Sequence, residues 1–400
     1  DFAVLSEDGV QVVDGDGRPI DREPKVVQWD PVSAEKGGYD RFMQKEIFEQ
    51  PRSITDTIGT RIDEASLEID LDGIAFDRDW VDHLKRITLV ACGTASYACM
   101  IGKYMIEHIA QIPCEVDLSS EFRYRKPILD DKCMVVPVSQ SGETADTLAA
   151  LRDTQSPNYV GRLAVCNVDS SSLVRESELV FLTKAGPEIG VASTKAFTTQ
   201  LAGLLMLVLA LGRQKGLADD EIEKVLEELR QLPNLIEQAA ALDKPIEKLS
   251  EAFVEKHHAL FLGRGVHFPV ALEGALKLKE ISYIHAEAYA AGELKHGPLA
   301  LVDSEMPVVS VAPNDELLEK LKSNLQEVRA RGGELYVFAD KNAHVKEGEG
   351  IHVLSMPAVP ETIAPIVYTV PLQLLSYHVA VLRGTDVDQP RNLAKSVTVE

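Results

Sequence analysis

Two kinds of hydrophobic spacing alternate along this chain, and together they predict its fold class. Short runs of β-branched and other apolar residues, such as residues 87–92 and 134–138, predict buried strands. Many of these runs are followed by stretches in which apolar residues recur every three or four positions, which predicts helices. Strands that alternate with helices are typical of mostly parallel sheets covered by helices. We therefore predict an α/β fold.

The order of these elements occurs twice. Residues 259–265 resemble residues 89–94, and residues 307–314 resemble residues 134–142, in each case where a strand meets a helix. Each copy also ends in a long apolar helix. The chain is therefore predicted to contain two similar α/β domains in tandem.

The same pattern divides the chain into segments of different character. Short alternating runs near the N-terminus predict a hairpin with too few apolar residues to fold alone, which suits the end of a larger upstream domain. Within a helical connector, Pro233 and Pro245 are expected to break the helix. The predicted segments are the upstream remnant (1–32), a helical lead-in (33–77), the first α/β domain (78–218), the connector (219–249), the second α/β domain (250–390) and a C-terminal tail (391–400).

Composition narrows the possible functions. A net charge of −22 argues against binding to nucleic acid or to an anionic membrane surface. A small phosphorylated substrate stays possible, because a local group of backbone N–H groups can hold an anion against the overall charge. The five cysteines are scattered, which favours reduced thiols of a cytoplasmic protein over disulfides or a zinc site. The longest apolar run, residues 201–211, is too short to cross a bilayer and predicts a buried helix.

A hydroxyl-rich loop, residues 138–144, lies between a predicted strand and a predicted helix. Helix N-termini present unpaired N–H groups, and Gly142 lets the backbone approach a ligand closely. Pro137 is expected to end the preceding strand. The loop is open to two interpretations, a phosphate-binding loop at the carboxyl end of a strand or an ordinary Ser/Thr helix cap. Its counterpart, residues 312–315, carries no hydroxyl group and is predicted not to bind phosphate.

Residues 190–195 have the same loop-to-helix character, with the same two interpretations. A third candidate is the set Glu273, Lys277 and Glu280, which share one helix face. A carboxylate beside an ammonium group suits a general base and an anion stabiliser, but the same spacing is typical of a surface ion-pair ladder.

Two further residues have side chains suited to catalysis. Lys395 lies in the C-terminal tail, where a lysine can form an imine with a keto sugar, although such tails are usually frayed. His296 lies in a loop bounded by glycine and proline, where an imidazole can transfer a proton or the loop can be a simple turn.

Several of these motifs occur together, in this order, in one known family. They are residues 139–144, 190–195, 273–280, 285–287, 292–298 and 388–400. On these residues, and from about residue 33 onward, the chain resembles the isomerase part of the glutamine–fructose-6-phosphate aminotransferases (isomerizing), also called glucosamine-6-phosphate synthases. The resemblance implies two tandem sugar isomerase (SIS) domains, a homodimer, and no metal or other cofactor.

The resemblance also implies a role for each motif. Lys395 would form a Schiff base with the open keto sugar, Glu280 would move a proton between C1 and C2, and Lys277 would support the developing charge. His296 would assist ring opening from the neighbouring subunit. The implied substrate-binding residues are Ser139, Gln140, Ser141 and Thr144 on the phosphate, and Thr94, Val191, Ala192 and Ser193 on the rest of the sugar.

The implied reaction converts fructose 6-phosphate to glucose 6-phosphate. In the complete family enzyme, ammonia from glutamine leads instead to glucosamine 6-phosphate for the synthesis of amino sugars and UDP-N-acetylglucosamine. Because only a remnant of the family's glutaminase domain is expected here, we predict that this chain does not use glutamine and uses free ammonia poorly. Ala95 stands where the family often has serine, so one sugar contact is expected to be missing or relocated.

Two other functions stay open on the sequence. One is a related SIS enzyme that breaks down a sugar phosphate, such as a deglycase or a plain isomerase. The other is a sensor that binds a sugar phosphate without turning it over, but such a sensor would have no use for Lys395, Glu280 and Lys277 together.

Overall fold

The computed structural model describes residues 2–7, 9–23, 35–59, 61–63, 68–71, 73–76, 78–129, 132–154 and 161–399. Parts of the predicted remnant and lead-in, residues 24–34 and 64–67, lie outside the described residues. The chain divides into two units, Asp1–Glu35 and Lys36–Glu400. The first contains the predicted hairpin, β1 (Phe2–Ser6) paired antiparallel with β2 (Gly9–Val13), followed by β3 (Pro19–Ile20). The side chains of β1 are exposed, as expected for a hairpin with no core of its own.

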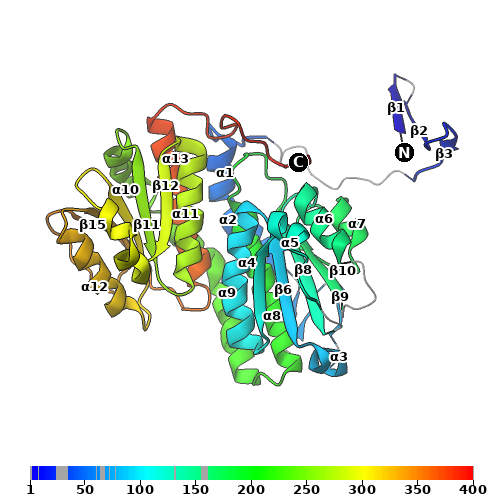
Figure 1. The fold of residues 1–400 in the computed structure, drawn as a ribbon, viewed down its shortest axis with the longest axis horizontal. Helices are drawn as coiled ribbons and strands as arrows, with labels where there is room; N and C mark the ends of the chain where they lie inside the picture. Colours follow the sequence, from blue (N-terminus) through cyan, green and yellow to red (C-terminus); the bar gives the residue numbers. More distant parts are fainter. Residues whose placement is uncertain are drawn as a thin grey trace. The chain divides into compact units, whose positions relative to one another are not determined.

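The larger unit contains two five-stranded sheets in which all strand pairs are parallel, so the predicted fold class is confirmed (Figure 1). The first sheet has the strand order β10-β9-β8-β6-β7, and the second has the order β12-β11-β13-β14-β15. When the strands of each copy are numbered from its first strand and the second order is read in reverse, both sheets have the order 5-4-3-1-2. This match confirms the predicted repeat. The strands are β6 (Arg86–Ala91), β7 (Cys114–Leu118), β8 (Cys133–Ser139), β9 (Gly161–Cys166), β10 (Leu179–Leu182), β11 (His258–Gly263), β12 (His285–Ala290), β13 (Pro307–Ala312), β14 (Glu334–Asp340) and β15 (Ile351–Met356).

Helices cover both sheets, and helices α4 and α11 lie between them (Figure 1). A short hairpin of β4 (Ile62–Asp63) and β5 (Glu68–Ile69) follows the lead-in helices α1 and α2. The α-helices are α1 (Phe42–Phe48), α2 (Gln50–Ile58), α3 (Arg78–His83), α4 (Gly93–Met105), α5 (Ser119–Arg125), α6 (Ala145–Asp153), α7 (Ser172–Glu176), α8 (Lys195–Gln214), α9 (Asp219–Ala240), α10 (Asp243–Ser250), α11 (His267–Ser282), α12 (Leu318–Arg329) and α13 (Ala364–Leu382). A π-helical turn, Ile106–Ala110, extends α4, and 3₁₀ turns lie at Glu251–Phe253, Ala291–His296 and Pro298–Leu301.

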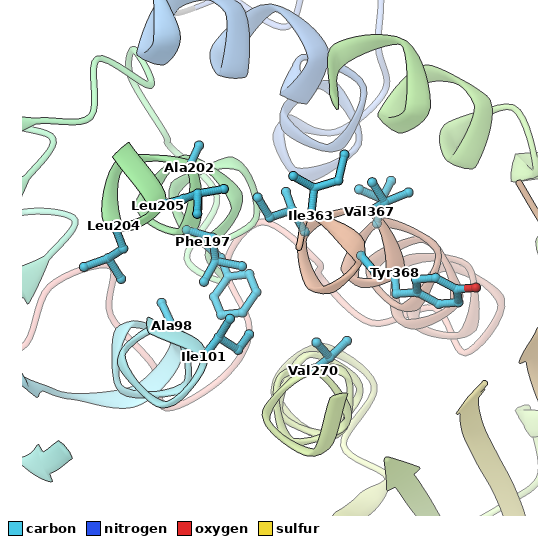
Figure 2. Packing of buried hydrophobic residues seen from close by; sticks show 14 of the residues in the cluster. Ala98, Ile101, Phe197, Ala202, Leu204, Leu205, Val270, Ile363, Val367 and Tyr368 are labelled. Atoms are coloured by element: carbon cyan, nitrogen blue, oxygen red, sulfur yellow. The ribbon is translucent and has the colours of Figure 1, made fainter. Parts of the chain in front are cut away.

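One hydrophobic core joins the two halves of the larger unit. Figure 2 shows Phe197 of α8, Ile101 of α4, Val270 of α11 and Val367 of α13 converging on it. Helices α8 and α13 are long and apolar enough to cross a membrane by length and composition, but 94% and 89% of their most apolar windows are buried in the protein. The apolar run at residues 201–211 therefore belongs to a buried helix, as predicted, although that helix is longer than the run.

The expectation that Pro233 breaks the connector helix is wrong. Helix α9 continues through Pro233 to Ala240, and the break comes just before α10, where Pro245 lies in the first turn. An interior proline costs a helix about 3 kcal/mol. The apolar stripe of α9 is buried, and each large side chain in it contributes about 1.5–3 kcal/mol, so packing outweighs the lost hydrogen bond.

The expectation that Pro137 ends its strand is also wrong. Strand β8 runs two residues further, to Ser139, and Pro137 pairs with Val90 of β6. On its other side the ladder between β8 and β9 skips Val136 and Pro137 and resumes at Val138. The missing N–H is thus accommodated by a local gap in one ladder, while the rest of the strand stays paired.

Candidate active site

A cavity of about 260 Å³ lies at the carboxyl end of the first sheet. Its walls come from the ends of β6 and β8, the loop before α8, one face of α11 and the C-terminal tail. Parallel sheets commonly bind ligands at such strand ends. The predicted site residues that line the cavity are Thr94, Ser139, Gln140, Ser141, Thr144, Val191, Ser193, Lys277, Glu280 and Lys395.

The hydroxyl-rich loop after β8 forms one end of this cavity. Within it, Ser139 Oγ accepts a hydrogen bond from Gly142 N (3.0 Å), and Ser141 Oγ accepts one from Glu143 N (3.2 Å). Gly142 has a φ of +65°, and a Cβ there would lie 2.2 Å from Ser171 Oγ, so only glycine fits. Thr144 is the N-cap residue of α6 but makes no side-chain cap hydrogen bond. Its hydroxyl is therefore not used as an ordinary helix cap.

Replacing Thr144 by alanine should raise KM for a sugar phosphate by about tenfold or more and change kcat much less. A charge-assisted hydrogen bond to phosphate contributes about 1.5–3 kcal/mol, and a group that holds the substrate equally in the ground and transition states acts on KM. Steady-state kinetics would measure both constants, with Thr55→Ala on the exposed face of α2 as a matched control. A fall in kcat at unchanged KM would show that Thr144 acts in the transition state and not in binding the substrate.

Helix α8 is capped by a carboxylate that the sequence did not single out. Glu188 Oε1 accepts hydrogen bonds from Thr194 N (2.9 Å) and Ala196 N (3.0 Å), while the N-cap Thr194 makes no side-chain cap bond. The interpretation of residues 190–195 as a self-capping Ser/Thr motif is therefore wrong. Glu188 leaves Ser193 available to line the cavity. Ala192 is fully buried behind this wall and does not line it.

Lys395 reaches the cavity from the C-terminal tail, where its ammonium group is held by the loop before α8. Its Nζ donates hydrogen bonds to Glu188 Oε2 (2.6 Å) and to the carbonyl oxygen of Gly190 (2.8 Å). Glu188 is completely buried; burial raises its pKa, but Lys395 and the helix N–H groups outweigh this and hold the pKa below its usual value. The resting pair is therefore an ammonium–carboxylate ion pair.

The tail that carries Lys395 is fixed to the rest of the larger unit and is not frayed. The carbonyl oxygen of Val397 accepts a hydrogen bond from Ala145 N (2.9 Å) at the start of α6. The carbonyl oxygen of Asp388 accepts one from Val191 N (2.9 Å), and its carboxylate accepts bonds from the first N–H groups of α1. Arg391 stacks over the ring of Tyr283, 4.2 Å from its centroid. These contacts position the lysine before any ligand binds.

The helix face of Glu273, Lys277 and Glu280 is not a surface ion-pair ladder. The side chains of Lys277 and Glu273 are fully buried, and Glu280 is 23% exposed toward the cavity. Lys277 Nζ lies 2.6 Å from Glu280 Oε2, 3.5 Å from Glu273 Oε1 and 3.0 Å from Thr94 Oγ1. Although burial lowers the pKa of Lys277, the two carboxylates raise it above its usual value. Lys277 is therefore a fixed positive charge at the cavity.

Glu273 makes a testable contribution to the pH dependence of stability. Burial raises its pKa from 4.5 to about 8, partly offset by Lys277. Between these pH values the folded state binds a proton that the unfolded state has lost, so the free energy of unfolding falls as pH rises. Glu273→Gln removes this penalty: its stability relative to wild type should be about equal near pH 5 and about 3 kcal/mol greater near pH 7. Urea unfolding at both pH values measures the difference, and a constant offset would contradict the assignment.

With this geometry established, comparison with known proteins places the chain in a family. The sequence profile of the SIS domain family matches residues 83–210 and 252–383. The chain belongs to the SIS domain family. The two matched ranges each cover one sheet with its helices, so the chain contains two tandem SIS domains, as the resemblance implied.

Individual SIS relatives carry the name that the sequence motifs suggested. The glutamine–fructose-6-phosphate aminotransferases (isomerizing) of Pseudomonas syringae pv. tomato and Pseudomonas aeruginosa are 58% and 57% identical to the chain over 401 residues. The alignment covers all of this chain and 66% of each relative, so the chain spans slightly less than two thirds of their length. The predicted resemblance to this group is confirmed.

Solved SIS structures agree with this result. The C-terminal domain of glucosamine–fructose-6-phosphate aminotransferase from Francisella tularensis is 52% identical, with a TM-score of 0.85 over 89% of this chain and 100% of that one. A glucosamine-6-phosphate deaminase from Thermotoga maritima superposes with a TM-score of 0.69 at 24% identity, covering 89% of this chain and 99% of that one. The second likeness shows a shared SIS fold alone.

One predicted residue of the SIS site lies elsewhere. His296 ends the 3₁₀ turn Ala291–His296 after β12 of the second SIS domain, where it is exposed and does not line the cavity of its own chain. The resemblance assigns this histidine to a neighbouring subunit. Ala95, the departure from the family pattern, does line the cavity. The neighbouring Thr94 hydroxyl donates to Glu273 Oε1 (3.3 Å), so Thr94 also links the first SIS domain to α11 of the second.

A second cavity, of about 760 Å³, lies at the corresponding strand ends of the second SIS domain and is also lined by residues 104–109 of the first domain and by α9. Its walls carry four carboxylates, from Glu228, Asp315, Glu316 and Glu361, and one lysine, Lys224. This excess of negative charge would disfavour a phosphate group. The expectation that residues 312–315 do not bind phosphate stays a prediction.

Proposed function

We propose that the chain is the isomerase part of a glutamine–fructose-6-phosphate aminotransferase and converts fructose 6-phosphate to glucose 6-phosphate. One observation carries the proposal. A hydroxyl-rich anion loop, a lysine nucleophile and a carboxylate–ammonium pair face the same 260 Å³ cavity, although they come from the first domain, the tail and the second domain. A sugar phosphate held at the loop by its phosphate would extend toward Lys395 and Glu280.

The chemistry of the proposed reaction follows from these groups. Lys395 adds to the C2 carbonyl of the open keto sugar and, with loss of water, gives an iminium ion. Water then cleaves the C=N bond and frees Lys395, and Glu280 moves a proton from C1 to C2 of the open ketose through an enediol, so that the aldose keeps an oxygen on C2. Lys277, a fixed cation beside Glu280, stabilises the negative charge that develops between C1 and C2. In the whole enzyme, ammonia would enter the same sequence and lead to glucosamine 6-phosphate.

Opening the ring form of the substrate requires a further acid–base group. Within the described residues no histidine lines this cavity, so the group has to come from elsewhere. We propose that a second copy of the chain supplies His296, so the working unit is a homodimer in the cytoplasm. Mixing Lys395→Arg chains with His296→Ala chains should restore activity to hybrid dimers that keep one intact site. A failure of every mixture to regain activity would argue against the shared site.

A product assay tests the proposal as a whole. The chain is incubated with fructose 6-phosphate, and glucose 6-phosphate is measured with a coupled dehydrogenase, with and without ammonium. We expect enzyme-dependent formation of glucose 6-phosphate without ammonium. Binding without product would support a sugar-phosphate sensor, and release of ammonia from glucosamine 6-phosphate without isomerisation would support a deaminase.

A further inference from the structure

Glu188 occupies a position that its capping role alone does not explain. One carboxylate oxygen holds the first turn of α8 through two backbone N–H groups. The other oxygen accepts a 2.6 Å hydrogen bond from Lys395, the proposed nucleophile. Since the side chain is completely buried, these partners stabilise its negative charge. The same carboxylate thus joins a rigid helix end to the reacting amine.

A lysine ammonium group has no lone pair and must lose a proton before it can attack a carbonyl carbon. Lys395 has two hydrogen-bond acceptors within the described residues, Glu188 Oε2 and the carbonyl oxygen of Gly190. A carboxylate is a far stronger base than a peptide carbonyl oxygen, so of the two acceptors only Glu188 is suited to take up this proton. We propose that Glu188 is a catalytic residue that accepts the proton of Lys395 when the imine forms and returns it to the departing hydroxyl group.

The proton transfers balance over the whole step. Glu188 takes one proton from the ammonium group, and the amine lone pair forms a bond to C2 while the carbonyl electron pair moves to oxygen. A second ammonium proton and the one stored on Glu188 pass to this oxygen, which leaves as water as the C=N bond forms. The three protons of the ammonium group end as one on the iminium nitrogen and two in water, and Glu188 is again a carboxylate.

The other nearby carboxyl groups are less suited to this task. Glu280 is paired with Lys277 at 2.6 Å. Glu46 of α1 faces the same loop from the other side, where it accepts hydrogen bonds from Ile189 N and Gly190 N. Exclusion of water by a bound sugar would favour the neutral amine–acid pair of Lys395 and Glu188 over the ion pair, because burial penalises charged forms. The transfer is therefore easiest when the substrate is in place.

The inference rests on the proposed function, and one experiment tests both separately. The probe is 5-deoxyfructose 6-phosphate, which lacks the hydroxyl that closes the ring, so ring opening by histidine does not enter. Samples are quenched into borohydride at fixed pH, and the reduced adduct on Lys395 is measured by mass spectrometry. Wild type and Glu188→Gln are compared from about pH 6 to about pH 9. The glutamine keeps an oxygen that can accept the two N–H groups of α8.

The rate of adduct formation should depend differently on pH in the two proteins. In wild type the proton moves within the Lys395–Glu188 pair, so the rate should change little with pH. In Glu188→Gln the amine must lose its proton to water, and the rate should fall steeply as the pH is lowered. The deficit should therefore be largest near pH 6, about a hundredfold as is typical of general acid–base effects, and shrink as pH rises.

Glu46→Gln is the matched control, since it makes the same chemical change in the other buried carboxyl group at this loop. Burial and Glu188 raise the pKa of Glu46 to about 7, which lies within the pH range of the experiment. Glu46→Gln therefore also shows whether titration of Glu46 contributes to the adduct profile. Its adduct profile should keep the wild-type shape. Absence of any adduct in wild type would overturn the proposed function. Adduct formation with parallel profiles in wild type and Glu188→Gln would overturn the role of Glu188 alone.

Discussion

Replacing Lys395 by arginine should lower the rate of glucose 6-phosphate formation at least about a thousandfold, while the sugar phosphate still binds. Arginine keeps the positive charge next to Glu188, but its guanidinium stays protonated and cannot form an imine. Without the imine, Lys395 does not hold the opened sugar at C2, so the proton transfer from C1 to C2 loses this positioning. The phosphate loop after β8 is untouched by the substitution. The coupled assay measures turnover, and calorimetry with fructose 6-phosphate measures binding.

The matched control is Lys279→Arg, because Lys279 is exposed on α11 and does not line the cavity. It should show wild-type turnover and binding. Retention of substantial turnover in Lys395→Arg would exclude the imine and leave an enediol route through Glu280 alone. Loss of binding together with turnover would mean that Lys395 contributes much of the free energy of substrate binding, and that the loop of residues 138–144 contributes less than we propose.

The features of the fold that depend on residues close together in the sequence could be predicted from the sequence. Strand and helix periodicity gave the parallel α/β class, and the repeated order of elements gave two domains. The two proline predictions were wrong because they applied a local rule where tertiary packing decides. Around Pro233 the buried stripe of α9 supplies more free energy than the missing bond costs.

The site was predictable where its residues are close in sequence and not where they are far apart. The loop of residues 138–144 carries its hydroxyl groups on Ser139, Ser141 and Thr144, close together in the sequence, so it could be recognised as a candidate anion-binding loop. The spacing of Glu273, Lys277 and Glu280 gave a shared helix face, but a periodic pattern does not say whether that face meets solvent or the first SIS domain. Glu188 was missed because its partner Lys395 is 207 residues away and no motif surrounds it.

Replacing Lys277 by methionine should reduce both stability and turnover. Methionine has a similar volume but removes the cation that lies 2.6 Å from Glu280 Oε2, and removing one member of a buried ion pair costs about 3–5 kcal/mol. Loss of the fixed charge beside Glu280 should lower kcat about a hundredfold to a thousandfold, as for the removal of a donor that stabilises a developing anion. KM should change little, since the loop of residues 138–144 is unchanged. Lys279→Met, two residues along the same helix, controls for the chemical change.

A double variant separates the two effects of Lys277. In Glu273→Gln/Lys277→Met the cost of burying the Glu273 carboxyl group is gone, so the free energy of unfolding at pH 7 should recover much of the loss, while Glu280 still faces the cavity. Because the cation is still absent, kcat should stay as low as in the single variant. Recovery of stability without recovery of kcat would assign Lys277 to the transition state. Recovery of both would mean that Lys277 acts only by stabilising α11 against the first SIS domain.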